Sequence, residues 1–333
     1  MNFLADYLPF AAKAVTIALL ALLPLVLLLL VLRQARGRRD ELRLTVRKLN
    51  DRLLDSRLAM EAAMLSDKAF KARVKDAHKR HKAEPQDGSR RRLFVCEFDG
   101  DLRADAVSSL REELTAILQV ARPQDEVAVV LESAGGTIHG YGLAASQLQR
   151  VRDHGLRLTT LVDKIAASGG YMMACVGDEL VCAPFAIVGS IGVVAQLPNF
   201  HRLLRKHDVD FELLTAGRYK RTLTMFGENT PAGREKFQAE LDEAHGLFKE
   251  FVARHRPALD LDQVGTGEYW LGTRAQTLGL VDRLATSDEF LTARAAEWDV
   301  LLVEMARPRS WLERLLAPLH TALGRLLNAP PTP

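Results

Sequence analysis

The sequence predicts an α/β fold with a mostly parallel sheet. From Arg92 onward, short apolar runs of strand length alternate with longer segments of helical periodicity. One of these runs, Val127–Leu131, is apolar throughout and indicates a buried strand. The chain has 333 residues, which is enough for a membrane anchor and one substantial domain with a large core.

An apolar segment lies near the N-terminus. Residues 14–32 are 19 consecutive residues without a charge, about the length that crosses a bilayer, and Pro24 is compatible with insertion. In a cleaved signal peptide, basic residues precede the apolar run and a small-residue cleavage site follows it. We therefore expect residues 1–35 to be an uncleaved anchor. The basic residues here follow the run, as Arg33, Arg36, Arg38 and Arg39.

The same arginines bear on the orientation in the membrane. Positively charged residues beside a membrane span favour the cytoplasmic side. The pattern therefore predicts a single-pass protein of the cell inner (plasma) membrane, with the large domain that follows the anchor in the cytoplasm.

Residues 36–91 form a basic segment. Residues 33–92 hold 19 Lys and Arg against 9 Asp and Glu, a net charge of +10, whereas residues 93–333 carry about −7. A long polar helix is predicted up to residue 84, followed by a linker that breaks it. A partial heptad begins this helix: Leu42, Val46, Leu49 and Leu53.

Three roles stay open for this basic helical stalk: a solvated spacer, self-association, or contact with anionic lipid. We expect no nucleic-acid partner, because its run of Lys and Arg is not interleaved with aromatic residues for base stacking.

The third region, residues 92–305, is the expected α/β domain. Thr230 and Pro231 open its longest helix as N-cap and first helical residue. The expected strands are 93–98, 127–133, 156–162, 180–183, 187–194 and 211–215. The expected helices are 104–121, 138–153, a short one from Ser168, 199–207 and 231–254.

The tail, residues 306–333, carries leucines at helical spacing from Ser310 to Asn328. We expect an amphipathic helix interrupted at Pro318. It either packs against the domain or lies in the membrane interface.

Ser168 is the candidate nucleophile. It stands in Ala167-Ser168-Gly169-Gly170-Tyr171, where a serine between a small residue and a glycine pair can expose its hydroxyl at a helix start. Amide groups there favour a developing oxyanion. The alternative is that Ser168 is simply the N-cap of the next helix. A second glycine pair, Gly135-Gly136, follows the strand 127–133 and is a candidate oxyanion loop.

Lys220 is the candidate base. A serine hydroxyl is a weak nucleophile until a base takes its proton, and a partly buried, neutral lysine can do so. Arg218 and Arg221 flank Lys220, and cationic neighbours favour the neutral amine. Lys164, four residues before Ser168, is the competing base.

A Ser-His arrangement is a further alternative. His139 is close to the glycine loop, and Glu132 or Asp163 would complete a triad.

Five motifs in order, between about Val127 and Leu284, give the chain a recognisable pattern. It resembles the signal peptide peptidase A family of Ser-Lys peptidases, in its SohB-like branch. The motifs are Glu132-Ser133-Ala134-Gly135-Gly136, Ala167-Ser168-Gly169-Gly170-Tyr171, Val188-Gly189-Ser190-Ile191-Gly192-Val193, Gly217-Arg218-Tyr219-Lys220 and Leu278-Gly279-Leu280-Val281-Asp282. One departure is Ala134, where the family usually has proline.

The resemblance implies a Clp protease/crotonase-like fold, with Ser168 as nucleophile and Lys220 as base. The amides of Gly136 and Gly169 are then the candidate oxyanion donors, and Ser190 is the candidate for orienting Lys220. The resemblance also implies a homo-oligomeric ring in which adjacent protomers supply the serine and the lysine.

The sequence carries no signal for a cofactor or metal. It has no Walker loop and no GxGxxG motif that opens a helix, and its histidines lack metal-ligand spacing. Three cysteines in apolar surroundings, Cys96, Cys175 and Cys182, are expected to be free buried thiols.

The sequence therefore predicts a membrane-anchored serine endopeptidase. Its expected substrates are membrane-associated peptides or signal peptide remnants, with peptide and membrane lipid as partners. Two alternatives stay open: a crotonase-like acyl-CoA enzyme, which also uses paired amides, and a non-catalytic membrane scaffold.

Overall fold

The computed structural model describes residues 43–83 and 90–306. The predicted anchor in residues 1–35 and the predicted amphipathic tail in 306–333 lie outside the described residues, except for Ala306. All the predicted site residues belong to one compact unit, Thr45–Met305.

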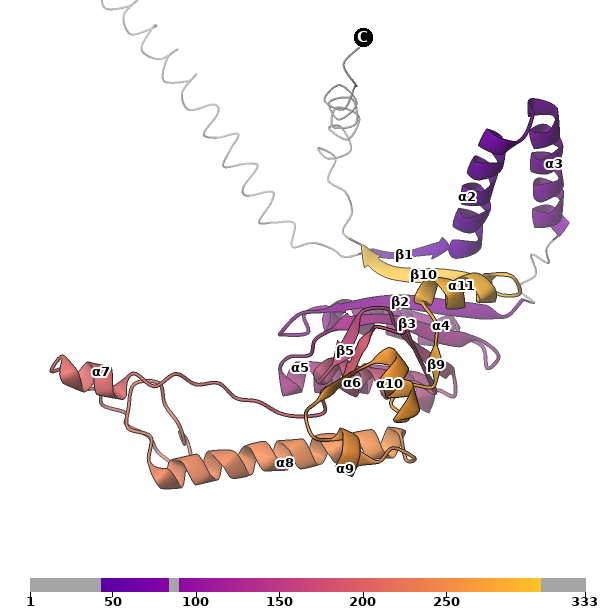
Figure 1. The fold of residues 1–333 in the computed structure, drawn as a ribbon. Helices are drawn as coiled ribbons and strands as arrows, with labels where there is room; N and C mark the ends of the chain where they lie inside the picture. The colour runs from indigo at the N-terminus through magenta and orange to yellow at the C-terminus, as the bar shows by residue number, and fades with distance from the viewer. Residues whose placement is uncertain (1–42, 84–89, 307–333) are drawn as a thin grey trace, which may run out of the picture. The chain divides into compact units, whose positions relative to one another are not determined.

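A mostly parallel sheet organises this unit, as predicted (Figure 1). The main path of the sheet runs β1-β10-β2-β3-β4-β6-β9, and a branch of β5, β7 and β8 leaves it at β3. The strands are β1 (Arg43–Lys48), β2 (Arg92–Gly100), β3 (Glu126–Ser133), β4 (Arg157–Val162), β5 (Ile165–Ala167), β6 (Glu179–Cys182), β7 (Ile187–Gly189), β8 (Tyr269–Leu271), β9 (Arg283–Leu284) and β10 (Asp299–Ala306).

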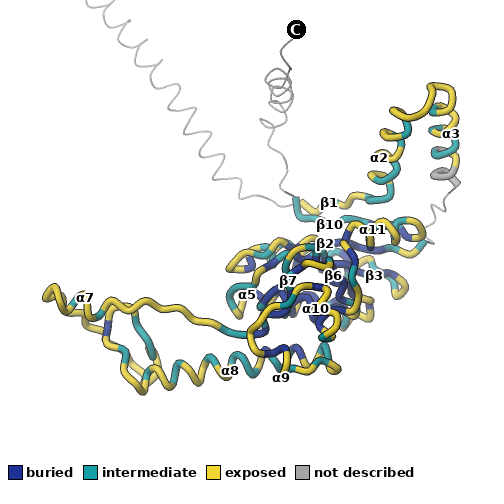
Figure 2. Tube along the Cα trace, viewed as in Figure 1, coloured by how far each residue is buried: buried dark blue, intermediate teal, exposed yellow. Residues whose placement is uncertain are grey.

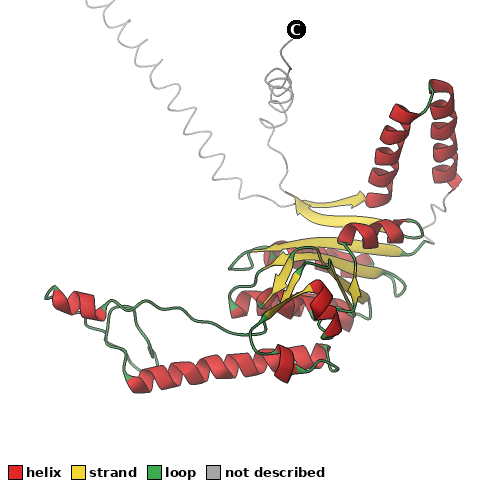
Figure 3. Ribbon diagram, viewed as in Figure 1, coloured by secondary structure: helices red, strands yellow, loops and turns green. Residues whose placement is uncertain are grey.

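Helices lie beside the strands and between them in the chain (Figure 3). The helices predicted around 104–121, 138–153, 199–207 and 231–254 are present. The described helices are α2 (Leu49–Met64), α3 (Asp67–Ala83), α4 (Val107–Val120), α5 (Ile138–Asp153), α6 (Gly169–Ala174), α7 (His201–Lys206), α8 (Pro231–His255), α9 (Leu261–Val264), α10 (Gly272–Thr277) and α11 (Ser287–Ala295).

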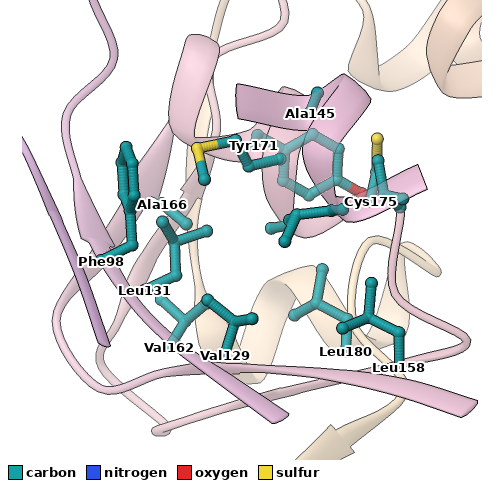
Figure 4. Packing of buried hydrophobic residues seen from close by; sticks show 14 of the residues in the cluster. Phe98, Val129, Leu131, Ala145, Leu158, Val162, Ala166, Tyr171, Cys175 and Leu180 are labelled. Atoms are coloured by element: carbon teal, nitrogen blue, oxygen red, sulfur yellow. The ribbon is translucent and has the colours of Figure 1, made fainter. Parts of the chain in front are cut away.

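The core has one cluster on each face of the sheet, because successive side chains of a strand point to opposite faces. In β2, Phe94, Cys96 and Phe98 join the larger cluster with α4, α5 and α6, whereas Leu93 and Val95 join the smaller one with Phe290 of α11. Figure 4 shows part of the larger cluster, in which the ring of Tyr171 lies among aliphatic side chains of the strands.

The predicted cap of α8 is confirmed. The side chain of Thr230 accepts a hydrogen bond from the amide of Gly233 at 3.1 Å, and Pro231 is the first helical residue. Both features stabilise a helix start, since they satisfy or remove amides that have no partner in the first turn.

The prediction of one long helix over residues 36–84 was wrong in its described part. Arg43–Lys48 is a strand, and two helices follow it with a break near Leu65 and Ser66. The strand forms because β10, some 250 residues later, lies beside it: Thr45 donates to the backbone carbonyl of Glu304 at 3.3 Å. This partner cannot be recognised from local sequence.

Two further expectations differ from the structure. Residues 211–215 are not a strand: they are exposed and have no sheet partner. Phe211 instead contacts Phe226, with ring centroids 5.7 Å apart. The strand predicted over 187–194 ends at Gly189, because Gly189 and Ser190 both have positive φ and turn the chain.

A buried ion pair joins the starts of β2 and β3. The Asp125 carboxylate accepts hydrogen bonds from the Arg92 guanidinium at 3.0 Å and from the Arg122 amide at 2.8 Å. Burial raises the pKa of this carboxyl, but the hydrogen bonds from Arg92 and Arg122 outweigh burial and lower it below its usual range.

We expect Asp125→Ala to lower the free energy of unfolding by about 3 kcal/mol at pH 7, because it leaves Arg92 without its buried partner. A lowered carboxyl pKa stabilises the fold above the unfolded value of about 3.9, and this stabilisation is lost as pH falls through the folded pKa. Urea unfolding of the full-length protein at decreasing pH should therefore show the difference from wild type shrinking below about pH 4. Asp105→Ala, at an exposed position, is the control. A difference that stays constant down to pH 2 would contradict the assignment.

Candidate active site

Ser168 connects β5 to α6 in a strained conformation. Its φ and ψ are 52° and −120°, a region that costs a residue other than glycine about 1–3 kcal/mol. Its amide donates to the carbonyl of Gly189 at 2.8 Å, and its carbonyl accepts from the amide of Met172 at 2.9 Å. These bonds hold a sharp strand-to-helix turn, the kind of turn that exposes a nucleophile.

The Ser168 hydroxyl is not a helix cap. The residue occupies the N-cap position of α6, but its side chain makes no capping hydrogen bond. Within residues 43–83 and 90–306 the hydroxyl has no hydrogen-bond partner, so it is available to a substrate or a base.

The two glycine motifs are in contact. Gly135 has a φ of +90°, and a Cβ on it would lie 2.7 Å from the carbonyl oxygen of Ala167 and 2.8 Å from Ser168 Cβ and Gly169 N. Only glycine fits at these distances. The contact arises at the sheet branch, where Ser133 at the end of β3 pairs with Ala166 of β5.

The amides of Gly136 and Gly169 are both free in the described part of the chain, in which neither donates a hydrogen bond. Gly169 is the first residue of α6, whose leading amides have no acceptor inside the helix. The free amide of Gly169 directly follows Ser168, and the free amide of Gly136 follows Gly135, which contacts Ser168. Paired free N–H groups are the components of an oxyanion hole, in which fixed N–H groups stabilise a developing negative charge.

Ser190 lies beside the backbone of Ser168, one residue after the Gly189 carbonyl that binds it. Its amide donates to the carbonyl of Glu268 at 2.7 Å, and its hydroxyl donates to the carbonyl of Gly267 at 3.4 Å. The predicted hydrogen bond from Ser190 to Lys220 is not formed within one chain.

Lys220 is far less enclosed than predicted. It lies in an exposed arm, residues 193–230, in which Gly227 is the one buried residue, as Figure 2 shows by the yellow colour around α7. Among the described residues, its side chain has no hydrogen bond or ion pair, either with Ser168 or with any other residue. One chain thus brings together the segments that carry Ser168, Gly136, Gly169 and Ser190, but Lys220 of the same chain is not part of this site.

The competing base is engaged elsewhere. Lys164 is exposed and donates to the Glu132 carboxylate at 2.8 Å. The hydrogen bond to Glu132 and the negative charge of Glu132 raise the pKa of Lys164. A raised pKa keeps this amine protonated, so it cannot accept a proton from Ser168 at neutral pH.

The Ser-His alternative lacks an acid partner. His139 is exposed, Glu132 pairs with Lys164, and Asp163 accepts the amide of Ser287 at 2.7 Å and its hydroxyl. Neither acid therefore orients His139 in the described structure.

The three cysteines are free and buried, as predicted. Burial raises the pKa of the Cys96 thiol, and raises the pKa values of Cys175 and Cys182 to about 12. Thiols of this kind are inert as nucleophiles at neutral pH.

The sequence analysis did not predict the buried side-chain interactions that support the site. Ser133 accepts the amide of Gly135 at 3.0 Å. Arg256, one residue past α8, pairs with Asp282 at 2.9 Å, and Tyr171 of α6 donates to the nearby carbonyl of Leu280 at 3.0 Å. Ser133 and Asp282 both stand in motifs that mark the family, but their roles depend on partners distant in sequence.

Two family models match the chain: "Peptidase family S49 N-terminal" over residues 2–148 and "Peptidase family S49" over residues 150–301. A protein of Buchnera aphidicola subsp. Acyrthosiphon pisum named "Probable protease SohB" is 45% identical over 98% of this chain and 97% of its own length. The chain belongs to peptidase family S49. A Haemophilus influenzae protein of the same name is 54% identical over 67% of this chain and 63% of its own length.

Membership of family S49 makes the chain a peptidase related to these proteins. The residues gathered at the branch of the sheet lie within or beside the two matched regions. No helix in residues 43–83 or 90–306 has the length and hydropathy needed to cross a membrane. The segment predicted to do so, residues 14–32, lies outside the described residues.

Proposed function

We propose that this S49 peptidase is a membrane-anchored serine endopeptidase that uses a Ser168–Lys220 dyad to cleave membrane-associated peptides or signal peptide remnants. The observation that carries the proposal is the geometry at Ser168. The free hydroxyl of Ser168 stands in a strained turn that is followed by the free amide of Gly169. Gly135, whose neighbour Gly136 also has a free amide, contacts the same turn. Such strain persists where the surrounding structure holds it, and it is concentrated at functional sites.

In this mechanism Lys220, as the neutral amine, takes the proton of Ser168, and the serine oxygen attacks the scissile carbonyl. The amides of Gly136 and Gly169 bind the negative oxygen of the tetrahedral intermediate. Lys220 then protonates the leaving amine, and water hydrolyses the acyl ester. We also propose that the α/β unit has a Clp protease/crotonase-like fold, with which the paired amides and the mostly parallel sheet agree.

A neighbouring protomer supplies the lysine in this proposal. The arm that bears Lys220 exposes many large apolar side chains, and such a surface favours association with another protein. A homo-oligomeric ring, in which one heterologous interface repeats, would bring each arm to the Ser168 of the next subunit. The exposed apolar residues of the arm are Val194, Leu197, Phe200, Leu203, Val209, Phe211, Leu213, Leu214, Tyr219, Met225 and Phe226.

Attachment to the membrane is supported by the apolar residues 14–32 and the arginines that follow them. The arginines favour the cytoplasmic side of the inner membrane for the peptidase unit. Among the described residues, the first strand, β1, and the last strand, β10, are neighbours at one edge of the sheet: Thr45 bonds with Glu304, and Lys48 pairs with Asp299 at 2.9 Å.

A serine-directed phosphonate tests this proposal. We expect the full-length protein to form a covalent adduct on Ser168, detected by peptide mass spectrometry, because the phosphonyl oxygen can occupy the oxyanion hole. Ser168→Ala should abolish the adduct, and Ser146→Ala, at an exposed serine of α5, should retain it. A folded wild-type protein that is not labelled would overturn the nucleophile assignment. It would favour an acyl-CoA enzyme with paired amides or a scaffold.

A further inference from the structure

Tyr141 contacts residues of both glycine motifs. It belongs to the first turn of α5 and is completely buried. Its ring presses on the backbone of Gly169: a Cβ added to Gly169 would lie 2.4 Å from Cγ of Tyr141. The position of this amide therefore depends on where the tyrosine ring lies.

The hydroxyl of Tyr141 reaches the other motif. It donates to the carbonyl of Asp101 at 2.7 Å and forms a short hydrogen bond with the hydroxyl of Ser133. Ser133 in turn accepts the amide of Gly135 at 3.0 Å. The Ser133 hydroxyl also donates to the carbonyl of Gly100 at 3.2 Å. Hydrogen bonds thus link Gly135 through Ser133 and Tyr141 to the carbonyl of Asp101 in one chain of bonds, and bonds that are linked in this way strengthen one another.

The Asp101 end of this chain of bonds lies next to the residue that contacts Gly136. Leu102, next to Asp101, accepts the amide of Thr137 at 2.9 Å. A Cβ added to Gly136 would lie 2.1 Å from the carbonyl oxygen of Leu102, so the Gly136 backbone rests on this segment. The hydroxyl of Tyr141 thereby fixes the segment Asp101–Leu102 that contacts Gly136, and the ring of Tyr141 fixes the backbone of Gly169.

We propose that Tyr141 is a positioning residue that sets the separation and direction of the Gly136 and Gly169 amides. This inference rests on the proposed function, because it concerns the same oxyanion hole. Such donors stabilise a transition state only if they are held in place before the charge develops. One rigid side chain that contacts the supports of both donors fixes them relative to each other.

Tyr141→Phe tests the proposal, because it keeps the ring on Gly169 and removes the hydroxyl. We expect kcat to fall about 10- to 100-fold with little change in KM, less than the 10²- to 10³-fold loss when an oxyanion donor is deleted. The phosphonate should label Ser168 correspondingly more slowly. Thr160→Val is the matched control. It removes the hydroxyl of another fully buried residue, which donates to the Ala174 carbonyl at 2.8 Å, and should leave kcat near that of wild type.

A double-mutant cycle distinguishes positioning from loss of stability. Ser133→Ala breaks the same chain of bonds at its other hydroxyl, so it should also lower kcat. The double variant Ser133→Ala with Tyr141→Phe should fall little further than the worse single variant. The Ser133→Ala variant also provides the test if Tyr141→Phe does not fold.

Two outcomes overturn the inference while the proposed function stands. One is wild-type kcat and wild-type labelling of Ser168 in Tyr141→Phe. The other is an equal loss of kcat in Tyr141→Phe and Thr160→Val, which would indicate a general effect of losing a buried hydroxyl. A wild-type protein that the phosphonate does not label would instead overturn the proposed function, and this inference with it.

Discussion

Lys220→Ala is expected to lower kcat of the full-length protein on a peptide substrate by about 10⁴-fold or more, as is Ser168→Ala. The two residues act as a unit, and loss of either member of such a unit costs nearly as much as loss of both. The double variant should therefore be about as active as either single variant. The measurement is steady-state hydrolysis of a fluorogenic peptide, with thermal unfolding as the check on folding.

Lys164→Ala is the matched control for this experiment. Lys164 is close to Ser168 in sequence but pairs with Glu132 on the surface. We expect the variant to keep kcat within about 2-fold of wild type, because an exposed, solvent-screened ion pair contributes little. If Lys164→Ala were inactive and Lys220→Ala were active, the base would be Lys164.

Mixing the two inactive proteins should restore activity. In a ring that shares its sites, some interfaces in a mixture of Ser168→Ala and Lys220→Ala carry an intact Ser168 facing an intact Lys220. For random exchange of equal amounts, about one quarter of the interfaces are of this kind, so activity should recover to that fraction of wild type. The measurement is peptide hydrolysis after subunit exchange, which mass spectrometry of differently tagged subunits demonstrates.

The same mixture separates a shared site from a site within one chain. If exchange is complete and hydrolysis stays at the level of the single variants, the dyad lies within one chain and the arm must fold back to Ser168. A mixture of Ser168→Ala with the double variant is the control. It contains no intact Ser168 and must remain inactive in either arrangement.

Local sequence was sufficient for the elements that lie next to the site. The helix at 138–153 is present with the predicted bounds, and the strand predicted at 127–133 is β3. The serine at the start of a short helix is where the motif placed it. These features follow from apolar periodicity, glycine pairs and capping residues, which act over a few positions in the chain.

The features that local sequence did not predict depend on partners far apart in the chain. Arg43–Lys48 is a strand because β10 lies beside it, and residues 211–215 are not a strand because no partner does. Likewise, Ser133 could be recognised as part of a motif, but its bonds to Tyr141 and Gly135 required the folded backbone.

The sequence by itself determined the residue types of the site and their order: a serine before a glycine pair, a second glycine pair after a buried strand, and a lysine between arginines. Only the tertiary structure decided which of them meet. The pairing of Ser133 with Ala166 brings the two glycine motifs together, while the exposed arm keeps Lys220 away from Ser168 of its own chain. The physical reason is that strand pairing and burial join residues across the sequence, and local patterns do not specify them.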